Sequence, residues 1–192
     1  GLGYIGLPTA CILSSKGFKV IGVDINSEVV KRLNSKDIEN PEPGLAKFVK
    51  SAINSGDFKA QTIPKEADVF IICVPTPLTD EKKADLTYVK SAAKSILPYL
   101  RKDNLIILES TVPPGTTEGI LKHILEKSGL KIGNELYLDY CPERVIPGNI
   151  LKEIVENDRI IGGITQESAE LAKEVYQSFV KGKIYLTNAT TA

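Results

Sequence analysis

Three glycines, Gly1, Gly3 and Gly6, stand in the order Gly-x-Gly-x-x-Gly directly before an apolar segment. Such a loop suits a dinucleotide. The first glycine permits a tight turn, the second lets the backbone approach a pyrophosphate, and the third allows close packing of a helix on a strand. The N-terminus of the following helix offers unpaired N–H groups and the positive end of its dipole to the phosphates. Glycine-rich turns also occur without any nucleotide, so the loop alone indicates only a cofactor class.

Asp24 ends the apolar segment 19–24, which the pattern predicts to be a buried strand. An acid at that place accepts hydrogen bonds from the ribose hydroxyls of an adenosine and repels a 2′-phosphate. Ile25 and Asn26 follow it, so no arginine is at hand to bind such a phosphate. The sequence therefore predicts NAD, and not NADP, as the cofactor. The alternative is that Asp24 caps the next helix.

Two further loops follow apolar segments and carry threonines. Residues 74–77, Val-Pro-Thr-Pro, contain Thr76, and residues 109–115 contain Thr111. Ligands of open α/β sheets bind outside the carboxyl ends of the strands. We therefore expect Thr76 to contact the cofactor and Thr111 to reach its nicotinamide. The alternative for each loop is a turn made rigid by proline, with the hydroxyl as a cap.

The elements that must position these loops alternate between strand and helix patterns along the chain. This order predicts an α/β, Rossmann-like, doubly wound fold, with a mostly parallel sheet and helices on both faces. The expected strands are residues 19–24, 67–74, 105–108, 135–140, 159–163 and 183–186. The expected helices are residues 7–16, 27–33, 45–54, 85–100, 117–127 and 166–180.

Three other segments have local signals of their own. Gly17 is expected to stop the first helix, and Asp85 to cap the helix that it opens. Residues 40–44, Asn-Pro-Glu-Pro-Gly, predict a turn. Residues 141–157 differ from the rest of the chain and are expected to form a functional loop with a short helix.

The composition excludes several classes of protein. With 24 basic and 24 acidic residues among 192, the chain lacks the positive charge typical of nucleic-acid binding. No apolar run approaches the roughly 20 residues that a membrane span needs, and no secretory signal is visible. Three cysteines without CxxC spacing favour a reducing cytoplasm and no metal site. We expect packing roles for these cysteines and a solvated helix position for His123; the cysteines are Cys11, Cys73 and Cys141.

The chain begins at a glycine and contains no methionine, and no strand precedes the glycine loop that a strand should feed. Residues 186–192 carry no closing helix. We therefore expect residues 1–192 to be one NAD-binding domain. It would form the N-terminal part of a longer enzyme, whose first strand and central and C-terminal regions lie outside the chain.

Six motifs occur in order along nearly the whole chain. They are GLGYIGLPTA (1–10), IGVDIN (21–26), EPGL (42–45), VPTP (74–77), LESTVPPGTT (108–117) and CPERVIPG (141–148). Together they resemble the UDP-glucose/GDP-mannose dehydrogenase family. Residues 141–148, followed by residues 156–163, are most similar to the members that act on UDP-N-acetyl-D-mannosamine.

The resemblance implies NAD-dependent, four-electron oxidation of the C6 alcohol of a UDP-sugar to a uronate. It implies UDP-N-acetyl-D-mannosamine as the substrate, with UDP-N-acetylglucosamine and UDP-glucose as alternatives. In such enzymes a cysteine holds the intermediate as a thiohemiacetal and then as a thioester, which water hydrolyses. That cysteine, with a lysine and an asparagine, would lie beyond Ala192, so the chain alone is expected to be inactive. The family also implies a homodimer, formed through a central region outside this chain.

The resemblance also assigns roles to single residues. NAD would be held by the glycine loop together with Tyr4, Ile5, Asp24, Val74, Thr76 and Thr111. Glu143, near Thr111, would position or deprotonate the hydrolytic water, since a base needs a fixed place near both water and acyl carbon. Arg144 and Val145 would contact the nucleotide-sugar, the arginine through charge-assisted bonds. The alternatives are a surface-loop glutamate for Glu143 and an inter-domain salt bridge for Arg144.

Two other functions share part of this pattern. A β-hydroxyacid dehydrogenase also opens with Gly-x-Gly-x-x-Gly and a later acid. However, it would be expected to use a glycine-rich substrate loop and a helical lysine in place of the Pro-Glu-Arg-Val of residues 142–145. A module that senses NAD without turnover would share only the loop and Asp24. The sequence after Ala192 discriminates between them, because only the nucleotide-sugar enzyme needs a lysine, an asparagine and a cysteine there.

Overall fold

The computed structural model describes residues 1–38, 42–146 and 148–192. The first two residues of the turn predicted at 40–44, and Pro147 of the loop at 141–148, therefore lie outside the described residues. The chain forms two compact units, and each is described by itself. Unit 1 comprises Gly1–Pro64, Val145–Asn157 and Ser178–Gly182; unit 2 comprises Lys65–Arg144, Asp158–Gln177 and Lys183–Ala192.

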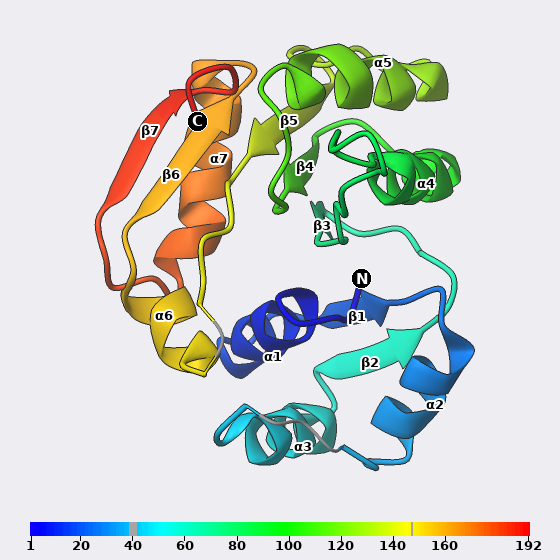
Figure 1. Cartoon of the computed structure of the whole chain (residues 1–192), viewed down its shortest axis with the longest axis vertical. Helices are drawn as coiled ribbons and strands as arrows, with labels where there is room; N and C mark the ends of the chain where they lie inside the picture. The colour runs from blue at the N-terminus through cyan, green and yellow to red at the C-terminus, as the bar shows by residue number, and fades with distance from the viewer. Residues whose placement is uncertain (39–41, 147) are drawn as a thin grey trace. The chain divides into compact units, whose positions relative to one another are not determined.

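Unit 1 contains a small parallel sheet with helices packed on it. Its elements are α1 (Gly6–Ser15), β1 (Val20–Val23), α2 (Ser27–Asn34), α3 (Leu45–Ser55), β2 (Phe58–Gln61) and α6 (Ile150–Glu156). Val20 of β1 pairs with Phe58 of β2, and Val23 with Gln61. Figure 1 shows the two strands side by side, with α2 and α3 next to β2. Apolar side chains from the strands and helices form one core, which includes Leu7, Val30, Leu45, Val49 and Phe58.

Helix α1 carries the glycine loop at its start. Residues 6–14 are all buried, as an apolar sequence on every side of a helix requires. Gly17 has a φ of 89°, and its N–H bonds the carbonyl of Ser14 at 3.0 Å. The predicted helix and its glycine stop are therefore confirmed.

Unit 2 contains a five-stranded sheet in the order β3-β4-β5-β6-β7. The strands are β3 (Val69–Ile72), β4 (Asn104–Leu108), β5 (Leu136–Tyr140), β6 (Arg159–Gly163) and β7 (Ile184–Asn188). Only β5 and β6 pair antiparallel; the other three pairs are parallel. The carboxyl ends of β3, β4 and β5 therefore lie at one edge of the sheet.

Helices cover both faces of this sheet (Figure 1). On one face, α4 (Thr87–Ile96) and α5 (Lys122–Leu125) bury Val89, Ala93 and Leu125 against Ile106 and Leu138. On the other face, α7 (Gln166–Gln177) packs along β4 to β7. The predicted mostly parallel sheet with helices on both faces is present in this unit.

Several predicted boundaries are wrong. Strand β2 was not predicted, because its four residues, Phe-Lys-Ala-Gln, bury only every second side chain. Helix α4 is shorter than residues 85–100 and passes into a 3₁₀ turn, Leu97–Tyr99; α7 ends at Gln177, three residues before the predicted Val180. The helix expected at 117–127 begins as a π-helix, Thr116–Leu121, after Gly115 with a φ of 84°.

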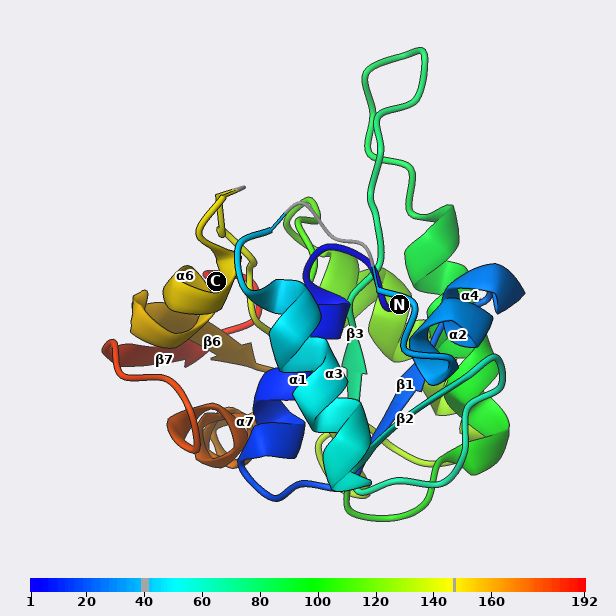
Figure 2. The same cartoon turned by 90° about the horizontal axis from the view of Figure 1, so that it is seen from below.

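Asp85 acts just outside the helix that it was expected to cap. Its Oδ1 accepts a hydrogen bond from the N–H of Thr87 at 2.8 Å, while Leu86 occupies the N-cap position. Before it, the chain between β3 and α4 projects as a long arm (Figure 2). The arm turns back at residues 79–83, where the N–H of Thr79 bonds the carbonyl of Lys83 at 2.8 Å.

Candidate functional site

In unit 1, the glycine loop is bound to the end of β1 through Asp24. The Oδ2 of Asp24 accepts a hydrogen bond from the N–H of Leu2 at 2.8 Å, and its Oδ1 accepts one from the N–H of Asn26 at 2.9 Å. The N-cap of α2 is Asn26, which bonds the N–H of Glu28. Asp24 therefore does not cap α2, and its half-exposed carboxylate stands beside the loop that we predict to bind pyrophosphate.

Gly3 and Gly22 show why the loop fits a dinucleotide. A Cβ added at Gly22 would lie 2.7 Å from Leu2 Cδ2, so a side chain there would require Leu2 or Phe58 to shift. A Cβ added at Gly3 would meet nothing within 4 Å, and the φ of Gly3 is not positive. The fold itself thus makes no demand for glycine at position 3, whereas a phosphate approaching the backbone would. Ile5, at the N-cap of α1, supplies no side-chain cap, which leaves this helix end to an anion.

Glu42, of the EPGL motif, joins three parts of unit 1 and was missed by the sequence reasoning. Its Oε1 accepts hydrogen bonds from the hydroxyl of Tyr4 at 2.9 Å and from the N–H of Gly148 at 2.8 Å. The pKa of Glu42 is lowered, first by the N–H of Gly148, against the opposing effect of burial, and then by Tyr4 and the N–H of Ile150. Ile150 opens α6, whose N-cap Asn149 gives no side-chain bond. Glu42 thus supplies the negative charge at that helix end and also fixes Tyr4.

In unit 2, the loops after β3, β4 and β5 are hydrogen-bonded to one another. Ser110 Oγ accepts from the N–H of Val74 at 3.1 Å and donates to its carbonyl at 2.9 Å. Thr76 Oγ1 donates to the carbonyl of Thr111 at 2.6 Å. Thr111 Oγ1 in turn donates to the carbonyl of Glu143 at 3.4 Å. The structure therefore brings the predicted residues Val74, Thr76, Thr111 and Glu143 together at the carboxyl edge of the sheet.

The carboxylate of Glu143 is bound through both of its oxygens. Its Oε1 accepts from the N–H of Arg144 at 2.7 Å, and its Oε2 lies 3.4 Å from Nη1 of Arg159. The side chain of Arg144 is exposed and donates to the carbonyl of Asp158 at 2.9 Å. Val145, the other residue predicted to contact the substrate, is half-buried and belongs to unit 1.

Behind Glu143 lies a buried group of charges that the sequence reasoning also missed. Arg159 Nη1 is 2.8 Å from Oε1 of Glu109, and the hydroxyl of Tyr176 donates to Oε2 of Glu109 at 3.1 Å. The guanidinium also lies 4.9 Å from the ring centre of Tyr176. Burial alone would lower the pKa of Arg159. The nearby carboxylate of Glu109 and other neighbours outweigh burial and raise this pKa, so Arg159 is charged. A usable signal was present: Glu109 and Arg159 each adjoin an apolar strand, and a charge buried there needs a partner.

None of the three cysteines has the properties of a nucleophile. All are buried and free of disulfides, as the predicted packing roles require. Burial raises the pKa of Cys11 to about 12 and that of Cys141 to about 11, and it also raises that of Cys73. Since the thiolate is the reactive form, burial disfavours the reactive form of all three thiols. His123 is exposed on α5.

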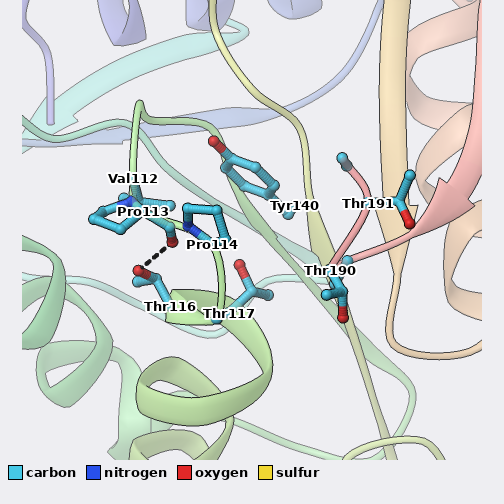
Figure 3. Close-up of a pocket in the computed structure, with 11 residues that line it drawn as sticks. Val112, Pro113, Pro114, Thr116, Thr117, Tyr140, Thr190 and Thr191 are labelled. Atoms are coloured by element: carbon cyan, nitrogen blue, oxygen red, sulfur yellow. Dashed lines mark hydrogen bonds between the residues drawn. The ribbon is translucent and has the colours of Figure 1, made fainter.

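A small pocket of unit 2 adjoins the loop that carries Thr111. It is lined by residues 112–117, Tyr140 and residues 189–192. In Figure 3, Thr116 donates from Oγ1 to the carbonyl of Pro113, at 2.7 Å, which fixes the turn into the π-helix. Short π-helical segments often occur at functional sites. Thr111 itself does not line this pocket.

Two features are absent from the part of the chain that the structure describes. None of its helices has the length and apolar character that crossing a bilayer requires. No three or more His, Cys, Asp or Glu side chains come together there in a way that could hold a metal ion.

Residues 1–180 match the model of the UDP-glucose/GDP-mannose dehydrogenase family, NAD binding domain. The chain belongs to this family. A UDP-N-acetyl-D-mannosamine dehydrogenase of Methanocaldococcus jannaschii is 57% identical over 195 residues, which cover 100% of this chain and 44% of the relative. An NDP-N-acetyl-D-galactosaminuronic acid dehydrogenase of Ralstonia solanacearum is 45% identical and is covered to 47% by the whole chain.

A solved structure supports the same family. The UDP-D-ManNAc dehydrogenase from Pyrococcus horikoshii matches with a TM-score of 0.96 and 46% identity, over 100% of this chain and 46% of that one. The predicted family, the Rossmann-like α/β fold and NAD as cofactor of the matched domain are confirmed. The chain spans less than half the length of these relatives.

Proposed function

We propose that the full-length protein containing this chain oxidises the C6 alcohol of a UDP-sugar to a uronate, using two NAD and one water. The proposal depends mainly on how the side chain of Glu143 is held. Its carboxylate is bound through both oxygens, and its loop is bonded to Thr111 from a neighbouring strand end. A carboxylate fixed in this way is suited to direct a water molecule at an acyl carbon.

NAD, when bound, accepts a hydride in each of the two oxidation steps. In unit 1, Asp24 would accept the adenosine ribose hydroxyls, and the start of α1, with Gly3, Tyr4 and Ile5, would bind the pyrophosphate. In unit 2, Val74, Thr76 and Thr111 would hold the cofactor. These assignments agree with the open space at Gly3 and the exposed part of Asp24.

The residues of this chain would act mainly in the last step, the hydrolysis of a thioester on a cysteine outside the chain. Glu143 takes a proton from water, the water oxygen bonds to the acyl carbon, and the thiolate leaves. Arg144 would bind the nucleotide-sugar, for which a guanidinium offers several donors to a carboxylate or phosphate. Over both oxidations the sugar loses four electrons to two NAD.

We propose UDP-N-acetyl-D-mannosamine as the substrate, because the loop at 141–148 and the relative with 57% identity point to the same sugar. Four UDP-sugars test this choice on the full-length protein: UDP-N-acetyl-D-mannosamine, UDP-N-acetylglucosamine, UDP-N-acetylgalactosamine and UDP-glucose. We expect two NADH per sugar from the first and much less from the others. Two NADH from another sugar would correct the substrate. NADH from none, with NAD still bound, would indicate a module without turnover.

The cofactor assignment can be tested separately. Asp24→Arg is expected to raise the KM for NAD about tenfold, as the loss of hydrogen bonds to a charged group implies, and to improve the relative use of NADP. Asp24→Asn keeps an acceptor for only one of the N–H groups of Leu2 and Asn26, so the melting temperature of each variant without cofactor is needed to separate loop folding from ribose binding. Asp37→Arg, on the surface after α2, is the control of equal charge change. An unchanged ratio of NAD to NADP use in both Asp24 variants would exclude the ribose role.

Two further features belong to the proposal. We propose a cytoplasmic location, because the cofactor is a cytoplasmic metabolite and the cysteines are unpaired. We also propose a homodimer that forms through a part of the protein outside this chain. Sedimentation of the full-length protein at several concentrations tests the second point; a monomer at all of them would contradict it.

A further inference from the structure

Glu143 is not held by its own loop alone. One oxygen is bound within the loop, by the N–H of Arg144 at 2.7 Å. The other lies 3.4 Å from Arg159, which enters from β6, sixteen residues along the chain. The side chain of Arg159 is 6% exposed and that of Glu143 is 8% exposed, so water screens this ion pair little.

Arg159 is itself held from two other elements. Glu109, after β4, accepts from Nη1 of Arg159 at 2.8 Å and is fully buried. Tyr176, on α7, donates to the second oxygen of Glu109 at 3.1 Å and places its ring beside the guanidinium. Cys73 and Cys141 also face the group, with Sγ at 3.8 Å from Glu109 and 3.7 Å from Arg159. These contacts, made with Glu109 after β4 and Tyr176 on α7, restrict the position of the guanidinium on β6.

A gain in folding stability is a weak explanation for the buried ion pair of Glu109 and Arg159. Removing two charges from water is costly, and apolar residues of similar volume often replace a buried ion pair without loss of stability. What apolar residues cannot supply is a cation at a fixed place beside Oε2 of Glu143. A site on rigid elements, supported by a second layer of bonds, holds a reacting group more precisely than a loop does.

We propose that Arg159 is the positioning residue for the Glu143 carboxylate, and that Glu109 and Tyr176 hold Arg159 in place. The proposal rests on the proposed function, in which Glu143 directs the hydrolytic water. Arg159 keeps the carboxylate turned toward β6, so that its orientation does not depend on the exposed neighbouring loop. Substrate binding and the first hydride transfer do not need this orientation, whereas thioester hydrolysis does.

The decisive variant replaces the pair and keeps the packing. In the full-length protein, Glu109→Leu with Arg159→Met removes both charges of the fully buried pair, so Glu109 is not left as a lone charge and Glu143 alone loses its cation. We expect the formation of the first NADH to change less than about threefold, while steady-state turnover falls about tenfold or more. The acid limb of the pH profile of kcat should move to higher pH, because a cation near Glu143 is lost.

Three further variants grade the effect. Arg159→Lys keeps the charge without the planar fork and should lie between the wild type and the double variant. Tyr176→Phe removes the hydroxyl that donates to Glu109 and should lower kcat a few-fold. Arg101→Met, which breaks an exposed ion pair with Asp68, is the matched control and should leave kcat and its pH profile unchanged. An unchanged kcat and pH profile in the folded double variant would overturn the proposal.

Failure of the proposed function would be visible on its own. If the wild type forms no NADH with any UDP-sugar, that function is wrong whatever the variants do. The positioning of Glu143 is then decided by crystal structures of the wild type and the double variant. A displaced or multiply oriented Glu143 carboxylate supports it, and an unchanged one overturns it.

Discussion

Glu42 in unit 1 and Glu109 in unit 2 are both nearly inaccessible to solvent, and the chain accommodates their charges by different means. Glu42 accepts from a tyrosine hydroxyl and from backbone N–H groups at the start of α6. Glu109 is paired with a cation, Arg159, and with Tyr176. The first arrangement fixes loops, because the groups that donate to Glu42 belong to loop residues. The second fixes a charge, and through it a further side chain, Glu143.

Asp139, in β5, is a third buried acid, and it has a different environment. It is fully buried, and neither carboxylate oxygen has a hydrogen-bond partner among the described residues. Burial raises its pKa to about 8, and the nearby Ser168 opposes this only in part. An acid with neither backbone donors nor a cation is thus neutral at pH 7, whereas Glu109 has a charged partner. The comparison predicts three different responses to substitution.

The largest response is expected where one charge of a pair is left alone. Arg159→Met leaves Glu109 buried without its cation and should lower the free energy of unfolding by about 3–5 kcal/mol. Adding Glu109→Leu should recover most of that loss. Urea unfolding of the full-length protein, followed by circular dichroism, measures both. A double variant as unstable as the single one would show that packing, and not charge pairing, governs this region.

Asp139 should give the next largest effect, and one that depends on pH. Its pKa in the folded state, about 8, is above the ordinary value of 3.8. The folded state therefore binds the proton more tightly, and stability falls as the pH rises from about 4 through 8. Asp139→Asn removes this dependence and should stabilise the protein by roughly 3–4 kcal/mol more at pH 9 than at pH 5. Thermal melts at the two pH values test this, and equal shifts at both would contradict it.

Glu42 should give the smallest effect on stability and a clear effect on binding. Glu42→Ala removes the oxygen that accepts hydrogen bonds from both Tyr4 and Gly148. The glycine loop and the segment before α6 are then no longer bonded to the same side chain. We expect the KM for NAD and for the UDP-sugar to rise together, each about threefold to tenfold. The lowered pKa of Glu42 means that its contribution is present at neutral pH and lost as the pH falls through that pKa.

Tyr4→Phe is the matched control for Glu42, because it removes one of the donors and leaves the carboxylate in place. It should raise only the KM for NAD. A change in the KM for NAD alone in Glu42→Ala as well would show that the contact with Gly148 carries no functional weight.

The contrast between these residues and the glycine loop shows what a sequence can reveal. Gly3, Asp24 and Thr111 could be proposed from the sequence because each of them lies in a local motif: a glycine loop, a strand end and a turn. Glu109 and Arg159 lie 50 residues apart, and Glu42 and Gly148 lie 106 apart. Their roles exist only once β6 is beside β5, or α6 beside the EPGL segment. Strand β2 was not predicted for a related reason: its four residues are too few for a clear pattern, and the strand is defined by its pairing with β1.

The hydrolytic role of Glu143 can be tested directly with one variant. In full-length Glu143→Gln, incubated with UDP-N-acetyl-D-mannosamine and NAD, we expect NADH to form in a burst and turnover then to stall. Intact-mass measurement should show the oxidised sugar nucleotide bound covalently to the protein. Equal slowing of the first hydride transfer and of turnover, with no covalent adduct, would contradict the hydrolytic role of Glu143.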